Sequence, residues 1–430
     1  MSTEDQMTID ERRKYLRRMK KRYRQANRKE QGHLLDEMEA VTELHRKSLI
    51  RLMNGSLERT PRLTQRGRTY GPETDDALRV IAESLDYICA QRLTPNLVWM
   101  AQHLAAHGEL RQSPELLQQL DRISVSTVQR TLARIRQDER RLPRKGPERA
   151  NQATRGIPMK RIPWNETQPG HFEVDLVHHS GPSPSGQYVH TLQMIDVTTG
   201  WSERVAVLGR SYCVMQDGFR RALARLPFSV RGIHPDNGTE FFNHHLLRFW
   251  GHVADHIELS RSRPFHKNDN PFVEQKNATL VRAYLGNERL DTVVQTLVLN
   301  QLYDKMWLYY NFFQPVMRLV EKIIIPAGEG QPARTKRRYD QPRTPFDRLC
   351  ETDAIQEEEQ QRLEALRDRT NPRTLRREIY ELIDYLFSLP NAIEGQTENV
   401  HETLTFPLEF YEKGADASVT FSFDTTITLR

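Results

Sequence analysis

The sequence predicts a multidomain protein with an all-α N-terminal region of helix-turn-helix type, an α/β core built on a mixed sheet, and a small C-terminal region. Three observations predict this organisation. The chain has 430 residues, more than one ordinary hydrophobic core would organise. Apolar residues recur at helical spacing through about the first 150 residues and alternate with polar ones from residue 171. A Pro-, Arg- and Lys-rich stretch at 142–163 separates the two patterns.

The first helical region is predicted over residues 1–70. A helical period runs through 30–54, is interrupted near 42–44, and ends at Gly55, which predicts two helices joined by a tight turn. The second helix, beginning at His45, carries cations on one side and aliphatic residues on the other, as a helix in the DNA major groove requires. A helical bundle without a DNA-binding role is the alternative.

The same logic recurs over residues 71–142. Leucines and other apolar residues keep a helical spacing from residue 97, and 123–132 has the pattern of a turn, a Ser124 cap and a recognition-type helix. A basic linker is predicted over residues 143–165. Its charge favours a DNA-binding role for the preceding helices over a helical bundle without such a role.

Lysines and arginines are concentrated in three short segments. Residues 12–29 hold eleven of them, and residues 140–161 hold eight against the single acid Glu148. A third cluster, at 334–338, follows the Gly/Pro-rich stretch 326–332, which has the composition of a flexible connection. Because each neutralised phosphate releases counterions, such runs favour binding to nucleic acid. For any one run, a solvated helix face or a disordered arm is the alternative.

Composition excludes several other classes of protein. No uninterrupted apolar stretch reaches the length of a membrane span, and the first residues are charged instead of forming a secretion signal. The three cysteines, Cys89, Cys213 and Cys350, lie too far apart for a disulfide framework, so we expect reduced, buried thiols. No Gly-rich Lys-Ser/Thr phosphate loop occurs, so no nucleotide cofactor is expected. We expect a cytoplasmic, nucleoid-associated protein without a membrane partner.

The α/β core is predicted over residues 166–320. Three strands joined by short loops predict an antiparallel meander, and helices then alternate with two further strands. This order, β-β-β-α-β-α-β-α-α, is that of a ribonuclease H-like core with helices on both faces of a mixed sheet. The strands are predicted at 171–177, 188–197, 203–208, 230–234 and 257–260, and the helices at 211–226, 240–253, 272–285 and 292–312.

Three carboxylates stand on elements that could bring them together. Asp175 interrupts an apolar run in the first strand, where an unpaired carboxylate is costly to bury. Asp236 follows the fourth strand in a turn, and the first and fourth strands of this fold are neighbours. Glu274 borders the apolar stripe of the helix at 272–285. Metal-assisted phosphoryl transfer requires such hard oxygen ligands at one point.

Each of these carboxylates has a structural alternative. An Asp before Asn-Gly is commonly a turn former, and Glu274 alone would be an ordinary helix residue. Glu173, Asp269 and Glu240 rank below the three as rivals. The adjacent histidines at 178–179 and 244–245 point apart on a strand or a helix, so we interpret them as structural.

Stretches 164–175, 235–241 and 262–277 together resemble the integrase-type catalytic domain of bacterial insertion-sequence transposases, which share the DDE triad with retroviral integrases. The resemblance implies that Asp175, Asp236 and Glu274 bind two Mg²⁺ ions, for which Mn²⁺ can substitute. The N-terminal helices resemble the end-binding portion of these transposases. A homo-oligomer on DNA is implied by the family. The zinc module of retroviral integrases cannot form, because Cys89 is the sole cysteine before residue 200.

The predicted function is that of a DNA transposase, which binds the ends of its mobile element and catalyses metal-dependent cleavage and strand transfer. The alternatives are a DNA-binding regulator with an inactive nuclease-like core and a ribonuclease H-type nuclease. For the cations around Glu274, which are Lys267, Lys276 and Arg282, a solvated helix face is the alternative to a contact with DNA phosphates. The predicted DNA-binding residues are Arg46, Lys47, Arg51, Arg130, Arg134, Lys145, Lys267, Lys276 and Arg282.

Beyond the core, three predictions concern the C-terminal part. The aromatic-rich stretch 304–320 is predicted as a packed helix end and not as a base-stacking platform. Residues 321–350 are predicted as a basic linker segment. Residues 351–430 are predicted as a helical region and an acidic tail, with helices over 351–389.

Overall fold

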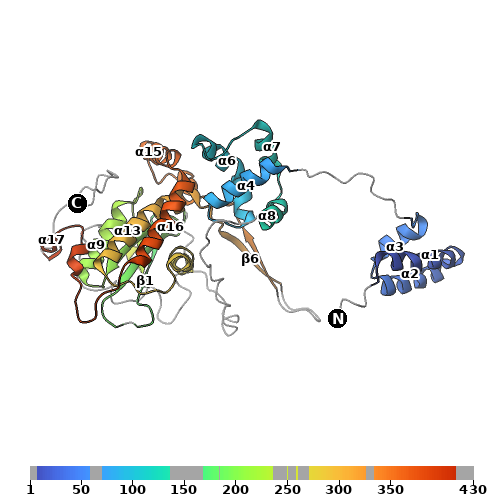
Figure 1. Ribbon diagram of the computed structural model, residues 1–430, viewed down its shortest axis with the longest axis horizontal. Helices are drawn as coiled ribbons and strands as arrows, with labels where there is room; N and C mark the ends of the chain where they lie inside the picture. Colours follow the sequence, from blue (N-terminus) through green and yellow to red (C-terminus); the bar gives the residue numbers. More distant parts are fainter. Residues whose placement is uncertain are drawn as a thin grey trace. The chain divides into compact units, whose positions relative to one another are not determined.

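The computed structural model divides the chain into two compact units, Met1–Thr69 and Tyr70–Arg430 (Figure 1). The finer domain boundaries predicted above stay predictions. The described residues are 7–58, 70–135, 168–183, 185–235, 249, 258–259, 271–325 and 334–412.

The first unit is built from three helices, α1 (Ile9–Gln25), α2 (Arg28–Thr42) and α3 (Arg46–Asn54). The two helices predicted within 30–54 are confirmed, and Gly55 forms the C-cap of α3. The sequence analysis treated α1 as a basic run and missed its helix. Leu16, Met19 and Tyr23 are its buried side chains, and this narrow apolar stripe is hard to see among the nine cations of the helix.

The second unit begins with short helices that correspond to the second predicted helical region. The predicted Ser124 cap is confirmed, because the Ser124 hydroxyl accepts a hydrogen bond from the Thr127 N–H at 3.3 Å. The helices are α4 (Pro72–Ser84), α5 (Ala90–Leu93), the 3₁₀ turn η2 (Thr94–Asn96), α6 (Leu97–Ala106), α7 (Pro114–Arg122) and α8 (Val125–Arg134).

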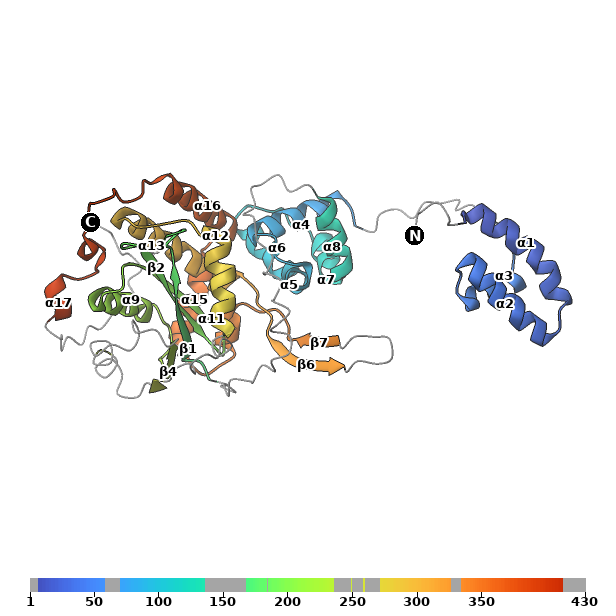
Figure 2. The same cartoon turned by 90° about the horizontal axis from the view of Figure 1, so that it is seen from below.

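The second unit contains a five-stranded mixed sheet (Figure 2). Its strand order is β3-β2-β1-β4-β5. The first three strands pair antiparallel, and β4 and β5 run parallel to β1, so the predicted meander and the predicted neighbours β1 and β4 are confirmed. The strands are β1 (His171–His178), β2 (Val189–Asp196), β3 (Ser202–Leu208), β4 (Gly232–Pro235) and β5 (Glu258–Leu259).

Helices cover both faces of this sheet (Figure 2). One face presents Phe172, Val174 and Leu176 to α9 (Tyr212–Ala224). The other face packs against α13 (Val293–Leu308) and against a continuous helix that we call the 271–285 helix. The 271–285 helix consists of α11 (Pro271–Lys276), the π-helical turn η4 (Asn277–Arg282) and α12 (Ala283–Leu285). The helix predicted at 240–253 lies outside the described residues except for Phe249.

The aromatic end of α13 is packed, as predicted. The π-helical turn η5 (Tyr309–Phe313) that follows α13 is buried throughout. The Tyr309 hydroxyl donates to the Ser84 carbonyl at 3.0 Å, and the Gln314 side chain donates to the Leu85 carbonyl at 3.1 Å. These contacts fix α4 onto the α/β core.

The prediction of a basic linker at 321–350 is wrong. Strands β6 (Leu319–Ile325) and β7 (Arg334–Tyr339) form an antiparallel hairpin, and α14 (Pro345–Cys350) follows. The run of cations concealed the β-forming residues on either side of the predicted flexible stretch 326–332, which lies outside the described residues.

The helices predicted over 351–389 are confirmed as α15 (Glu357–Asp368) and α16 (Pro372–Ser388). They do not form a separate region, because Leu375, Ile379 and Ile383 of α16 share a hydrophobic cluster with α13. Short helices η6 (Val400–Thr403) and α17 (Leu408–Glu412) complete the described chain.

The cysteines agree only in part with the expectation of buried thiols. Cys213 is buried and Cys350 is half-buried, but Cys89 is exposed, because it occupies the N-cap position of the short helix α5. In the described parts of the chain, every helix is too short or too polar to span a bilayer.

Candidate functional site

Asp175 lies on the face of β1 that the 271–285 helix covers. Its side chain is half-buried. Oδ2 accepts a hydrogen bond from the Asn277 side-chain amide at 2.6 Å, and Oδ1 accepts one from the Leu176 N–H at 2.8 Å. The strand carboxylate is therefore oriented by the π-helical turn of the 271–285 helix, a kind of turn that occurs frequently at functional sites.

Glu173, two residues earlier on the same face of β1, holds the start of the 271–285 helix. Its side chain is fully buried, and Oε2 accepts hydrogen bonds from the N–H groups of Phe272 and Val273, each at 2.9 Å. The other oxygen, Oε1, has no hydrogen-bond partner among the described residues. Burial raises the pKa of Glu173 to about 8; the two backbone N–H groups oppose this shift, and the nearby charge of Glu274 adds to it.

Glu274 sits in the first turn of α11, and its side chain is exposed. Asn277 follows it by three positions, the spacing that brings side chains to one side of a helix. Asn277 contacts Asp175, and the N–H groups of Phe272 and Val273 contact Glu173, so the helix that carries Glu274 lies against the carboxylates of β1. Two of the three predicted catalytic residues therefore belong to one locality.

The third predicted carboxylate, Asp236, lies outside the described residues. β4 ends immediately before it, and the last residue of β4, Pro235, is the parallel partner of Val174. The rival acids Glu240 and Asp269, the histidines at 244–245, and the predicted DNA-binding residues Lys145 and Lys267 also lie outside the described residues.

The donor chemistry at this locality fits a divalent cation. Asp175 and Glu274 offer carboxylate oxygens, the ligands that Mg²⁺ prefers. Within the part of the chain that the structure describes, no group of three His, Cys, Asp or Glu side chains could hold a metal ion.

Two cations predicted to contact DNA hold the 271–285 helix in place. The Lys276 ammonium lies 4.7 Å from the centre of the Tyr310 ring, and burial lowers the pKa of Lys276. Arg282 donates to the carbonyls of His178, at 2.6 Å, and Gly286, at 3.1 Å.

The N-terminal cations that were predicted to bind DNA differ in their partners. Arg46 forms an ion pair with Asp36 of α2, and Nη2 of Arg134 donates to both carboxylate oxygens of Asp75 of α4, at 2.9 and 3.0 Å. The other three predicted DNA-binding residues of the helical regions, Lys47, Arg51 and Arg130, are exposed.

The histidines at 178–179 have structural roles, as we expected. The His178 ring contacts the Tyr188 hydroxyl at 3.2 Å, and the buried His179 ring contacts the Thr191 hydroxyl at 2.8 Å. Burial lowers the pKa of His179 to about 3, and it does the same for His190 on the facing strand β2.

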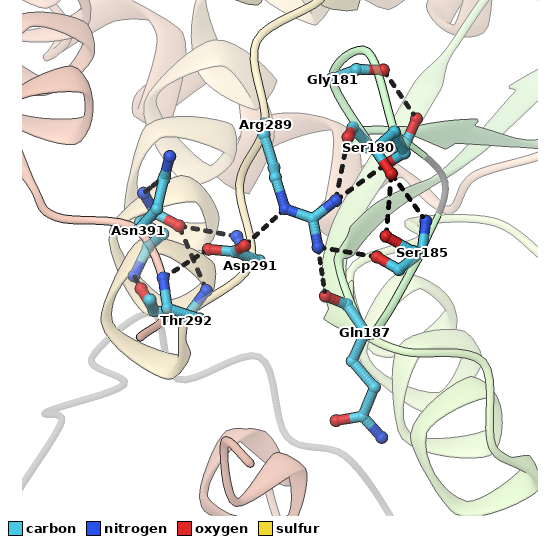
Figure 3. A network of polar contacts seen from close by, with 11 residues as sticks. Ser180, Gly181, Ser185, Gln187, Arg289, Asp291, Thr292 and Asn391 are labelled. Atoms are coloured by element: carbon cyan, nitrogen blue, oxygen red, sulfur yellow. Dashed lines mark hydrogen bonds and ion pairs between the residues drawn. The ribbon is translucent and has the colours of Figure 1, made fainter. Parts of the chain in front are cut away.

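Arg289, which the sequence analysis missed, anchors the loop between β1 and β2 (Figure 3). Its guanidinium pairs with Asp291 at 2.6 Å and donates to four loop carbonyls. Those carbonyls belong to Ser180, Ser183, Ser185 and Gln187. An isolated arginine between two predicted helices carried no signal of this role.

Comparisons with known proteins give one related sequence and several similar structures. No family model matches the chain. The uncharacterized protein y4rM of Sinorhizobium fredii is 37% identical over 328 residues, which is 76% of this chain and 91% of that protein. The HTLV-2 integrase catalytic core domain in complex with magnesium is 20% identical, covers 34% of this chain and 90% of its own, and has a TM-score of 0.26. The catalytic core domain of BIV integrase is 15% identical, covers 42% of this chain and 95% of its own, and also has a TM-score of 0.26.

Proposed function

This chain belongs to the same protein family as y4rM, and we propose that it is a DNA transposase, which binds the ends of a mobile element and catalyses metal-dependent DNA cleavage and strand transfer. The observation that carries the proposal is the contact between Asp175 and the 271–285 helix. It joins the central strand that bears Asp175 to the helix that carries Glu274, which supports the combination of strand and helix carboxylates that two-metal phosphoryl transfer uses.

In this proposal Asp236 is the third ligand. Pro235 is the parallel partner of Val174, and residue 236 is the next residue after Pro235. Consecutive α carbons joined by a trans peptide are about 3.8 Å apart. Asp175 is the next residue after Val174 on β1. The register of the two parallel strands thus supports a common locality for both aspartates.

The protein's own groups have distinct roles in the proposed reaction. Asn277 fixes the orientation of the Asp175 carboxylate, and Glu173 fixes the start of the helix that carries Glu274. Both contacts exist before substrate binds, so the carboxylates need little reorganisation. Mg²⁺ ions bound there would supply the activation of water or of a DNA 3′-hydroxyl and the neutralisation of charge on the leaving oxygen.

We assign end recognition to the two N-terminal helical regions, acting as helix-turn-helix modules. Helices α3 and α8 present Lys47, Arg51 and Arg130 to solvent, where they can reach phosphates or base edges. Arg46 and Arg134 also form ion pairs with acids on earlier helices, Asp36 of α2 and Asp75 of α4.

The test is a cleavage and joining assay with the full chain. The protein is incubated with Mg²⁺ or Mn²⁺, a labelled duplex from the DNA flanking its own gene and a supercoiled plasmid. We expect 3′-end nicking and joining to the plasmid, lost in Asp175→Asn and in Asp236→Asn. Asp353→Asn, at an exposed position on the C-terminal side, is the matched control and should remain active.

The alternatives predict different products. Binding to several flanking ends without cutting or joining, by a folded protein, would favour the regulator. Hydrolysis of RNA in a hybrid, without joining, would favour the ribonuclease H-type nuclease.

A further inference from the structure

The β6–β7 hairpin has an unusual surface for a two-stranded ribbon. All of its side chains that the structure describes, on both strands, are exposed. Val320, Ile323 and Ile325 are 47%, 42% and 48% exposed, although they are strong β-formers that usually pack against a second layer. A hairpin exposed on both faces is only marginally stable in water, so this one is suited to gain stability from a partner.

The hairpin is also strongly cationic. The two strands contain a single acid, Glu321, and five basic residues, which are Lys322 in β6 and Arg334, Lys336, Arg337 and Arg338 in β7. Lys336, Arg337 and Arg338 are consecutive and exposed in β7, so their like charges repel one another. Glu321 pairs with Arg338 at 3.3 Å and so neutralises one cation. A polyanion would relieve the remaining repulsion.

The base of the hairpin is fixed to the core. The Arg318 N–H donates to the Asp340 carboxylate at 2.6 Å, and the Asp340 N–H donates to the Arg318 carbonyl at 3.0 Å. Arg348 pairs with the same aspartate at 2.8 Å. The Arg318 guanidinium also lies 5.8 Å from the centre of the Phe272 ring, at the start of the helix that carries Glu274. The ribbon is therefore rooted next to the proposed catalytic locality.

We propose that the β6–β7 hairpin binds duplex DNA as a β-ribbon and helps to hold the substrate at the carboxylates, an inference that rests on the proposed function. A two-stranded ribbon fits the major groove, and the cations of β7 would contact the phosphates at its edges. A second copy of the chain fits less well, because a two-fold contact through this surface would oppose one set of cations to another.

The test compares two double variants of the full chain with equal changes in charge. Lys336→Glu with Arg337→Glu alters the hairpin, and Arg369→Glu with Arg377→Glu alters exposed positions near and on α16. Each protein is titrated with a short fluorescent duplex at several salt concentrations. We expect the hairpin variant to lose affinity roughly tenfold and to lower the salt slope by about 2, while the control stays close to wild type. Hydrogen exchange should show new protection of β6 and β7 when the wild type binds the duplex.

The outcomes separate this proposal from the transposase proposal. Equal affinities for all three proteins, with no protection of the hairpin but intact strand joining, would overturn the hairpin proposal alone. A hairpin variant that loses self-association while its DNA binding is unchanged would also overturn it, in favour of a second copy. A wild type that neither binds nor joins any duplex would overturn both. Unchanged unfolding midpoints will show that the variants are folded.

Discussion

The side-chain amide of Asn277 donates a 2.6 Å hydrogen bond to the Asp175 carboxylate across 102 positions of the sequence. This bond joins the central strand to the helix that carries Glu274. With the two backbone N–H groups that bind Glu173, it makes the strand and the helix a single rigid support. The orientation of the proposed catalytic carboxylates therefore depends on residues that are not themselves proposed ligands.

Removing the Asn277 amide should reduce activity more than stability. Asn277→Ala frees the Asp175 carboxylate to rotate, and we expect strand transfer to slow by roughly tenfold, equivalent to about 1.4 kcal/mol. The Mg²⁺ concentration for half-maximal activity should rise. Asn399→Ala, at a solvent-facing N-cap near the C-terminus, is the control. An Asn277→Ala protein with wild-type rate and metal dependence would remove Asn277 from this role.

Glu173 should matter for the position of the 271–285 helix. Glu173→Ala leaves the N–H groups of Phe272 and Val273 without their acceptor and creates a small cavity, so we expect a loss of about 2–3 kcal/mol in the free energy of unfolding. Glu173→Gln keeps an acceptor oxygen and should lose much less. Urea unfolding of the three proteins measures this order, and equal losses for Ala and Gln would contradict it.

Two buried histidines should make the second unit sensitive to acid. The folded-state pKa values of His179 and His190 are lowered to about 3, below the ordinary value of 6.5. The unfolded chain thus binds more protons, so their contribution to stability is present above pH 6.5 and is lost as the pH falls toward 3. The slope should approach about 1.4 kcal/mol per pH unit for each histidine. His190→Phe should make urea unfolding less dependent on pH across this range, whereas His401→Asn, an exposed site, should leave the slope unchanged.

A buried ion pair should hold α4 to the C-terminal helix α16. Asp86 accepts hydrogen bonds from Arg376 at 3.2 Å, Tyr380 at 2.9 Å and Tyr284 at 3.2 Å. Asp86→Ala leaves the Arg376 guanidinium buried without this partner, and we expect a loss of about 3–5 kcal/mol in the free energy of unfolding.

The double variant Asp86→Leu with Arg376→Met provides the control for this pair. It removes both charges, so it should recover part of the stability that Asp86→Ala loses. A double variant no more stable than Asp86→Ala would show that packing, and not the unpaired charge, sets the cost. Urea unfolding again provides the measurement.

Much of the fold could be predicted because its signals are local. Strand-like runs, the first three of them alternating and bounded by turn residues, located all five strands of the mixed sheet, and the cap at Ser124 located α8. The helix α1 was missed because its cations concealed a sparse apolar pattern, and the β6–β7 hairpin was missed because the cations of β7 predicted a linker although β6 is rich in apolar residues. The roles of Asp175, Asp236 and Glu274 stay predictions, although the structure brings the first and last of them to one locality.

The sequence by itself determined the order of helices and strands and the types of residue available for chemistry, since helical and strand periods, caps and turns act over a few neighbouring positions. Only the tertiary structure decided which side chains meet. The sequence pattern made Glu173 a weaker catalytic candidate than Asp175. In the structure, its carboxylate accepts a hydrogen bond from the N–H of Val273, 100 positions away. Arg134 pairs with Asp75, 59 positions earlier. Such partners are chosen by long-range packing and by the need to satisfy buried polar groups, which no local pattern encodes.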